Sequence, residues 1–85
     1  MPLEATLRIV GTREARTLNR SFRGRDYATN VLSFQYQKDK GDVVLCHPVI
    51  AREARAQGKK LAAHYAHLVL HGLLHLRAYD ATVAI

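Results

Sequence analysis

The sequence L-A-A-H-Y-A-H-L-V-L-H-G-L-L-H-L, residues 61–76, carries the strongest secondary-structure signal in the chain. Its apolar residues recur at spacings of three and four, which is typical of an α-helix. They cover most of the helix circumference, so we expect a helix that is largely buried. These apolar residues are Leu61, Tyr65, Leu68, Val69, Leu70, Leu73 and Leu76.

Two apolar segments before this helix favour β-strands. Residues 30–36 (N-V-L-S-F-Q-Y) and 42–46 (D-V-V-L-C) are rich in good β-formers. The five polar residues between them, 37–41, fit a short hairpin connection. The continuous apolar run in the second segment predicts a strand buried on both faces.

The other elements complete an α+β pattern. Residues 7–10 alternate and predict a strand, after which Thr12 offers an N-cap for a helix that ends at Gly24. Another helix begins near Pro48. The order predicts a single domain over residues 1–85, a small mixed sheet of about three strands packed on helices. The apolar face of the first helix consists of Ala15, Leu18 and Phe22.

Composition and charge indicate a globular, basic domain. The chain has 85 residues, of which 48% are hydrophobic and 24% charged, and this balance is typical of folded proteins. The net charge of +6 favours a polyanionic partner such as nucleic acid, although many small domains are basic only for solubility.

Several features argue for a cytoplasmic protein. Cys46 is the only cysteine, which excludes an internal disulfide and suits a reducing compartment. The sequence has no apolar run of transmembrane length and no signal-peptide pattern at its start. We therefore expect a cytoplasmic location and no membrane partner.

Four histidines follow one stripe of the last predicted helix. His64, His67, His71 and His75 are separated by three, four and four residues. His71 and His75, at i and i+4, can both turn a ring nitrogen toward one metal ion. Surface histidines or hydrogen-bonded core histidines would give the same spacing, and for an arbitrary pair that explanation is the commoner one.

A metal site on this helix needs a third ligand from elsewhere. His67 and His75 lie roughly 12 Å apart along a helix, too far to share one zinc ion. His47 and Asp80 are the obvious local candidates. No glutamate follows His71, so the H-E-x-x-H motif of zinc proteases is absent, which argues against peptide hydrolysis.

Three ordered blocks carry a family resemblance. Residues 67–80, H-L-V-L-H-G-L-L-H-L-R-A-Y-D, resemble the signature H-G-x-L-H-L-x-G-Y-D-H of the YbeY family, which comprises zinc-dependent endoribonucleases specific for single strands. Residues 18–34, L-N-R-S-F-R-G-R-D-Y-A-T-N-V-L-S-F, resemble that family's other signature. G-D-V-V-L-C from Gly41 and E-A-R-A-Q-G-K from Glu53 fall where the family has a strand and the following helix.

The resemblance implies a YbeY-like metal-hydrolase fold with zinc as cofactor. It makes His71 and His75 metal ligands and Arg23 a catalytic residue acting on the RNA phosphate. It also implies single-stranded RNA as substrate, in particular ribosomal RNA, and the small ribosomal subunit as a partner. The residues that match the family's substrate cleft are Arg23, Thr29, Asn30 and Ser33.

The chain departs from the family pattern at a position that bears on activity. The third family histidine directly follows Y-D, and that position is Ala81 here. The family also has a further strand and helix before the equivalent of Leu7, which we expect this domain to lack. The alternatives are therefore an impaired zinc-dependent endoribonuclease, a catalytically inactive RNA- or ribosome-binding domain of the same fold, and a truncated or engineered chain.

Other basic and aromatic residues are expected to play ordinary roles. The basic side chains are expected to be solvated, although together they could attract an RNA backbone. We expect Phe34, Tyr36 and Tyr65 in the core rather than as base-stacking platforms. The basic residues are Arg13, Arg16, Arg20, Arg52, Arg55, Lys59 and Lys60.

Overall fold

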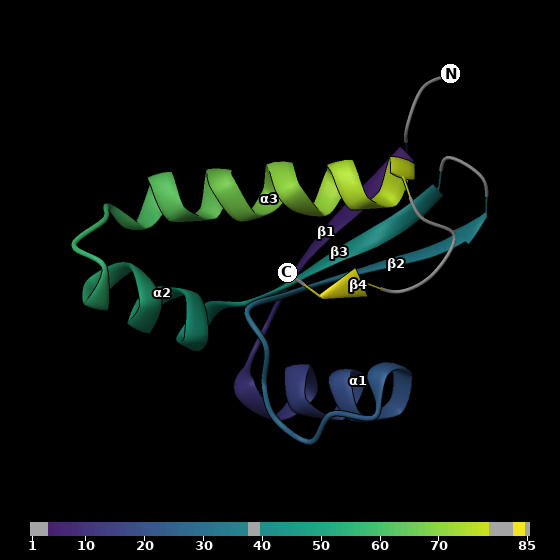
Figure 1. The fold of residues 1–85 in the computed structure, drawn as a ribbon, viewed down its shortest axis with the longest axis horizontal. Coiled ribbons are helices and arrows are strands. Elements are labelled where there is room, and N and C mark those ends of the chain that lie inside the picture. Colours follow the sequence, from purple (N-terminus) through teal and green to yellow (C-terminus); the bar gives the residue numbers. More distant parts are fainter. Residues whose placement is uncertain (1–3, 38–39, 79–82, 85) are drawn as a thin grey trace.

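A computed structural model of the chain describes residues 4–37, 40–78 and 83–84 (Figure 1). It confirms the predicted α+β class and the predicted order of elements, and it adds a short strand after the last helix. The elements are β1 (Glu4–Val10), α1 (Thr12–Arg23), β2 (Val31–Gln37), β3 (Lys40–Cys46), α2 (His47–Ala56), α3 (Leu61–Ala78) and β4 (Val83–Ala84).

The sheet is mixed, with strand order β1-β3-β2-β4. β1 runs parallel to β3, whereas β2 runs antiparallel to both β3 and β4. The antiparallel β2–β3 pair confirms the predicted hairpin. Val43, Val44, Leu45 and Cys46 are all at most 2% exposed, which confirms that β3 is buried on both faces.

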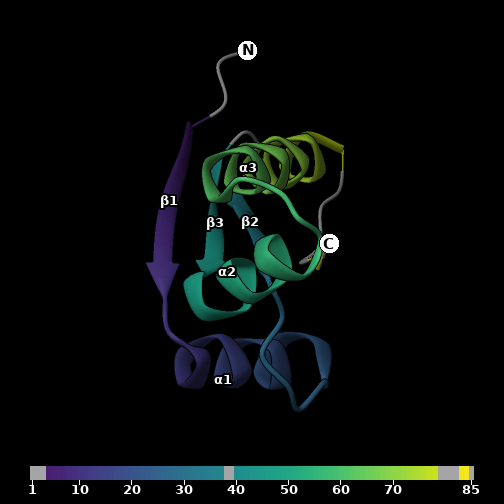
Figure 2. The ribbon, with the colours of Figure 1, turned by 90° about the vertical axis from the view of Figure 1, so that its left-hand side faces the viewer.

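Helices cover the two faces of the sheet (Figures 1 and 2). On one face, Val31, Val43 and Leu45 pack with Leu68 and Leu76 of α3. Since successive side chains of a strand point to opposite faces, the residues between them face the other way. There they meet α1.

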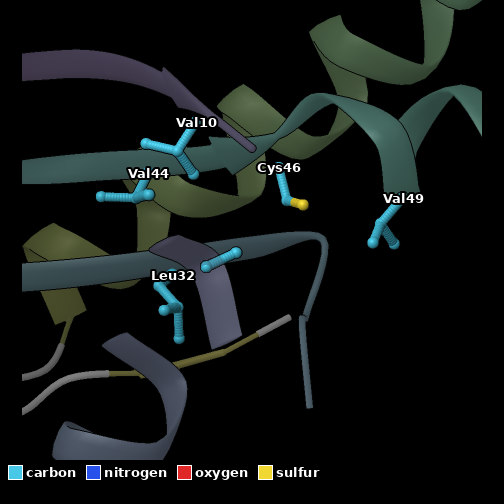
Figure 3. Close-up of a cluster of buried hydrophobic side chains, with 6 residues drawn as sticks. Val10, Leu32, Val44, Cys46 and Val49 are labelled. Carbon is cyan, nitrogen blue, oxygen red and sulfur yellow. The ribbon is translucent and has the colours of Figure 1, made fainter. Parts of the chain in front are cut away.

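The α1 side has a hydrophobic cluster of its own. Val10, Leu32, Val44, Cys46 and Val49 gather there (Figure 3), with Ala15 and Leu18 of α1 packed against them. α2 contributes to both clusters, through Val49 on this side and Ile50 on the α3 side. The layer order is α3, sheet, α1, with α2 joining the two clusters.

The exposure of α3 differs from the sequence-based expectation. Leu61, Leu70 and Leu74 are 42%, 56% and 54% exposed, so the prediction of a largely buried helix was wrong. α3 forms an outer layer, and in the described part of the chain no further layer covers its outward side. No described helix has both the length and the apolar character needed to cross a membrane.

The ends of α1 follow simple backbone rules. Gly11, not Thr12, is the N-cap residue, and no side chain donates or accepts a capping hydrogen bond there. Thr12 is instead the first helical residue, so its predicted N-cap role was wrong. Gly24 ends the helix in the left-handed conformation, with φ at 68°, which glycine adopts at little cost.

Candidate functional site

The candidate metal ligands lie on α3. His71 and His75 are both half-buried, and their spacing of four residues places them one helical turn apart on the same side. His64, nearer the start of the helix, is 4% exposed. The structure therefore separates this stripe into a buried histidine, a partly buried pair and the exposed His67.

A contact between the sheet and α3 fixes the backbone between the paired histidines. The Ser33 hydroxyl donates a buried hydrogen bond of 3.0 Å to the Gly72 carbonyl oxygen. A Cβ atom at Gly72 would lie 2.7 Å from Val43 Cγ1 and 3.2 Å from Ser33 Oγ. Glycine at this position therefore lets α3 approach the sheet closely, and the approach orients the helix that bears His71 and His75.

The His71 ring lies close to the His67 ring and affects the pKa of His67. Their centroids are 4.1 Å apart, with an angle of 47° between the planes. The proximity of His71 lowers the pKa of His67, with smaller contributions from burial and from the nearby positive charges of Lys59 and His64. A lowered pKa favours the neutral form of the exposed His67 ring.

The structure places one of the candidate third ligands, His47, against Tyr65. Among the described residues, no three His, Cys, Asp or Glu side chains are grouped as a metal site. His47 is exposed, and its Nδ1 forms a 2.6 Å hydrogen bond with the Tyr65 hydroxyl. The His47 ring packs against Tyr65, and in the described part of the chain this candidate does not join His71 and His75 in a group of three.

His71 and His75 are the right type of ligand for zinc, but they are fewer than the three protein ligands that a catalytic zinc site uses. Imidazole nitrogen is a normal zinc ligand, and catalytic zinc sites use three protein ligands. His71 and His75 supply two of them. Asp80, the other candidate, and Ala81, which stands where the family has its third histidine, lie outside the described residues.

The structure does not bring Arg23 together with the histidine pair. Arg23 is the last residue of α1 and is half-buried. α1 and α3 cover opposite faces of the sheet (Figure 2). Thr29, also half-buried, lies in the connection between α1 and β2. The substrate-binding roles of Arg23 and Thr29 and the catalytic role of Arg23 stay predictions.

The Asn30 side chain joins the start of β2 to α2, and Glu53 of α2 extends the link to α3. Its Nδ2 donates to Glu53 Oε1 and Oε2 at 3.0 and 3.3 Å, and its Oδ1 accepts from the Val31 N–H at 2.7 Å. Glu53 Oε1 also pairs with His64 Nε2 at 2.9 Å. The start of β2, α2 and α3 are thus linked through polar groups.

Sequence reasoning missed the link between Glu53 and His64. Glu53 is the only acidic residue in α2, where its close neighbours include Arg52 and Arg55. A single carboxylate in an otherwise basic helix was the one sequence feature that could have indicated a specific partner for Glu53.

The side chains of Asn30 and Ser33 both bond to neighbouring elements, and Ser33 is only 1% exposed. These contacts do not test substrate binding, so the roles of Asn30 and Ser33 in binding RNA stay predictions.

A basic surface lies on the outer side of α1. Arg16 forms a bidentate pair with Asp26, at 2.8 Å from Nε and 3.0 Å from its terminal nitrogen. The hydrogen bond from Arg16 is the main reason that the pKa of Asp26 lies below its usual value. A surface hollow beside this pair is lined by Thr12, Arg13, Arg16, Thr17 and Arg20.

Sequence comparison finds one family over nearly the whole chain. The family model described as "Endoribonuclease YbeY" matches residues 1–84. A protein of Nitrosomonas eutropha named Endoribonuclease YbeY is 60% identical over 82 residues, covering 93% of this chain and 58% of its own length. One of the same name from Aromatoleum aromaticum is 59% identical over 80 residues, covering 91% of this chain and 52% of its own.

Structure comparison agrees with the fold. A protein of Thermotoga maritima whose solution structure is known superposes with a TM-score of 0.69 at 30% sequence identity. The match covers 93% of this chain and 54% of that protein. The chain thus spans a little over half the length of the relatives named here and of the similar structure.

Proposed function

Because the chain belongs to the YbeY endoribonuclease family, we propose that it acts on single-stranded RNA as a zinc-dependent endoribonuclease. The proposed setting is ribosomal RNA maturation and ribosome quality control in the cytoplasm, with the small ribosomal subunit as partner. The proposal extends to this chain the activity that its relatives' names describe.

The observation that carries the proposal is the placement of His71 and His75. They lie one turn apart on α3, and the Ser33–Gly72 hydrogen bond fixes the helix between them against the sheet. A rigid helix that presents two imidazoles on one side is suited to metal binding, since preorganised ligands lose little freedom when the ion binds.

The residues of the proposed site divide into those that would bind the metal ion and those that would bind RNA. When bound, zinc supplies Lewis-acid chemistry and activates a water molecule. His71 and His75 hold the ion, and the Arg23 guanidinium binds an RNA phosphate through paired hydrogen bonds. Thr29 and Asn30, in the chain that follows α1 and leads into β2, are proposed to bind the same RNA strand.

A second function is favoured by the sequence at Ala81. With alanine where the family has its third histidine, and with two donors among the described residues, zinc would be held weakly. The chain would then serve as a catalytically inactive RNA- or ribosome-binding domain. Both functions predict that the chain binds RNA, but only the first predicts that it cleaves RNA.

Cleavage of a labelled single-stranded RNA by the purified chain tests the proposal. We expect slow cleavage that a chelator stops and added zinc restores, and that His71→Ala abolishes. His47→Ala is the matched control, because His47 is an exposed histidine engaged with Tyr65. RNA binding without cleavage, unchanged by zinc, would favour the second function, and loss of both binding and cleavage would contradict both.

A further inference from the structure

A surface pocket with aromatic walls lies across the sheet from the histidine pair. Phe34 and Tyr36 are on β2, and Phe22 reaches it from α1. The Phe22 and Phe34 rings meet edge to face, with centroids 5.0 Å apart and 72° between the planes. The pocket is lined by Arg8, Leu18, Phe22, Phe34, Gln35, Tyr36 and Asp42.

Strand register explains how these side chains meet. Phe34 pairs with Asp42 across the β2–β3 ladder, so both side chains point to the α1 face. Phe34 packs against the edge of the cluster beneath α1. Beyond it, Phe22 and Tyr36 are 59% and 62% exposed. The expectation that Tyr36 lies in the core was therefore wrong.

The exposed rings of Phe22 and Tyr36 border the same pocket. Exposed large apolar side chains that gather around a hollow mark binding sites more often than isolated ones do. Here the rings stand beside polar groups, since the Tyr36 hydroxyl lies 3.4 Å from Asp42 Oδ1, and Arg8 lines the same pocket. The pocket thus offers apolar aromatic walls with the Asp42 acceptor at its margin, next to Arg8, whose guanidinium pairs with Glu14.

We propose that this pocket binds one unstacked base of single-stranded RNA. Aromatic side chains stack on bases of any sequence, and the Asp42 carboxylate can accept a hydrogen bond from a base amino group. The same carboxylate disfavours a phosphate inside the pocket. The proposal rests on RNA being the ligand of the chain, as proposed above.

A basic surface on the other side of α1 is available to phosphates farther along the same strand. α1 separates the pocket from the hollow lined by Arg13, Arg16 and Arg20, and the whole chain carries a net charge of +6. Basic groups that follow the backbone, combined with aromatic rings that take the bases, are the usual means by which proteins hold single strands. The pocket would anchor the RNA on the face opposite His71 and His75.

Binding of a fluorescein-labelled RNA of about ten nucleotides, measured in a chelating buffer that prevents cleavage, tests the pocket. The double variant Phe22→Ala/Tyr36→Ala should bind about tenfold more weakly than the natural chain, which corresponds to about 1.4 kcal/mol. It should bind an abasic oligonucleotide of the same length as well as the natural chain does. Since no phosphate contact is lost, the slope of log K against log salt should not change.

Leu7→Ala provides the matched control. Leu7 is an apolar side chain 50% exposed on β1, and it pairs with Val43, so it faces the α3 side of the sheet. It should leave RNA affinity unchanged. Circular dichroism and thermal melting of each variant separate a lost base contact from lost folding. Phe22 and Tyr36 are chosen over Phe34 because Phe34 packs against the core.

The outcomes separate the pocket from the proposed function. If the natural chain binds neither oligonucleotide, both proposals fail. If the double variant binds both oligonucleotides as the natural chain does, and zinc-dependent cleavage is intact, only the base pocket fails. If the variant keeps its RNA affinity but loses self-association in sedimentation, the pocket is a protein interface and the proposal is overturned.

Discussion

At the scale of single residues, small polar contacts hold α3 in place. Ser33 bonds to the helix near its centre, and Glu53 bonds to His64 near its start. The sequence motif that contains Asn30 and Ser33 predicted a substrate cleft, whereas the structure shows that both residues also connect elements. The hydrogen bond between Ser33 and Gly72 can be tested by removing the Ser33 hydroxyl.

Ser33→Ala should destabilise the protein by about 1–2 kcal/mol, because the buried hydrogen bond to the Gly72 carbonyl is lost. Urea unfolding measures the change. Thr17→Ala is the control, since the Thr17 hydroxyl also donates to a helix carbonyl, that of Arg13, but at an exposed position. Its cost should lie within about 0.5 kcal/mol of zero. Equal losses in the two variants would contradict the role given to Ser33.

The pair formed by Arg16 and Asp26 predicts a pH dependence. The folded-state pKa of Asp26 is lowered mainly by the Arg16 hydrogen bond. The stabilisation is therefore present above the unfolded value of about 3.9 and is lost as the pH falls through the folded-state pKa.

Carboxyl NMR titration measures the pKa of Asp26 directly. Arg16→Gln should raise it toward its ordinary value, and Arg13→Gln should change it little, because Arg13 is not among the groups that shift it. An Asp26 pKa that is unchanged by Arg16→Gln would show that the pair does not persist in solution.

At the scale of elements, local patterns predicted what a segment is but not what covers it. The apolar run of β3 predicted burial on both faces, because a run without polar alternation suits only a central strand. The same reasoning failed for α3. Its leucines cover most of its circumference, yet Leu70 and Leu74 remain exposed, and no pattern within the helix reveals how many layers pack on it.

The face of α1 shows the same limit. The predicted apolar face consisted of Ala15, Leu18 and Phe22, whereas the structure buries Ala15 and Asn19 and exposes Phe22. Asn19 is accommodated because its Nδ2 donates to the Tyr27 carbonyl at 2.8 Å. A buried asparagine with a distant partner leaves no periodic signal, so the rotation of the helix could not be predicted.

Gly72 tests the approach of α3 to the sheet. Alanine favours a helix over glycine by about 1 kcal/mol, but its Cβ would lie 2.7 Å from Val43 Cγ1. Gly72→Ala should therefore destabilise the protein by about 1–2 kcal/mol net. In a Val43→Ala background the same change should cost much less, because the clashing methyl group is gone. Identical costs in both backgrounds would show that the contact does not limit the packing.

At the scale of the whole molecule, the sheet separates two proposed activities. His71 and His75 occupy the α3 face, and the aromatic pocket occupies the α1 face. The sequence predicted the histidine pair because helical spacing alone aligns it. It could not predict the pocket, because Phe22 and Phe34 meet only through the packing of α1 on β2.

The histidine pair is the centre of the account, and zinc affinity measured by competition with a chromogenic chelator tests it most directly. We expect weak binding by the natural chain and binding at least about tenfold tighter after Ala81→His, because a lost ligand costs more than a lost outer contact. RNA cleavage should rise in parallel, and His71→Ala should abolish zinc binding in both backgrounds. Zinc affinity that is unchanged when both His71 and His75 are replaced would contradict the account.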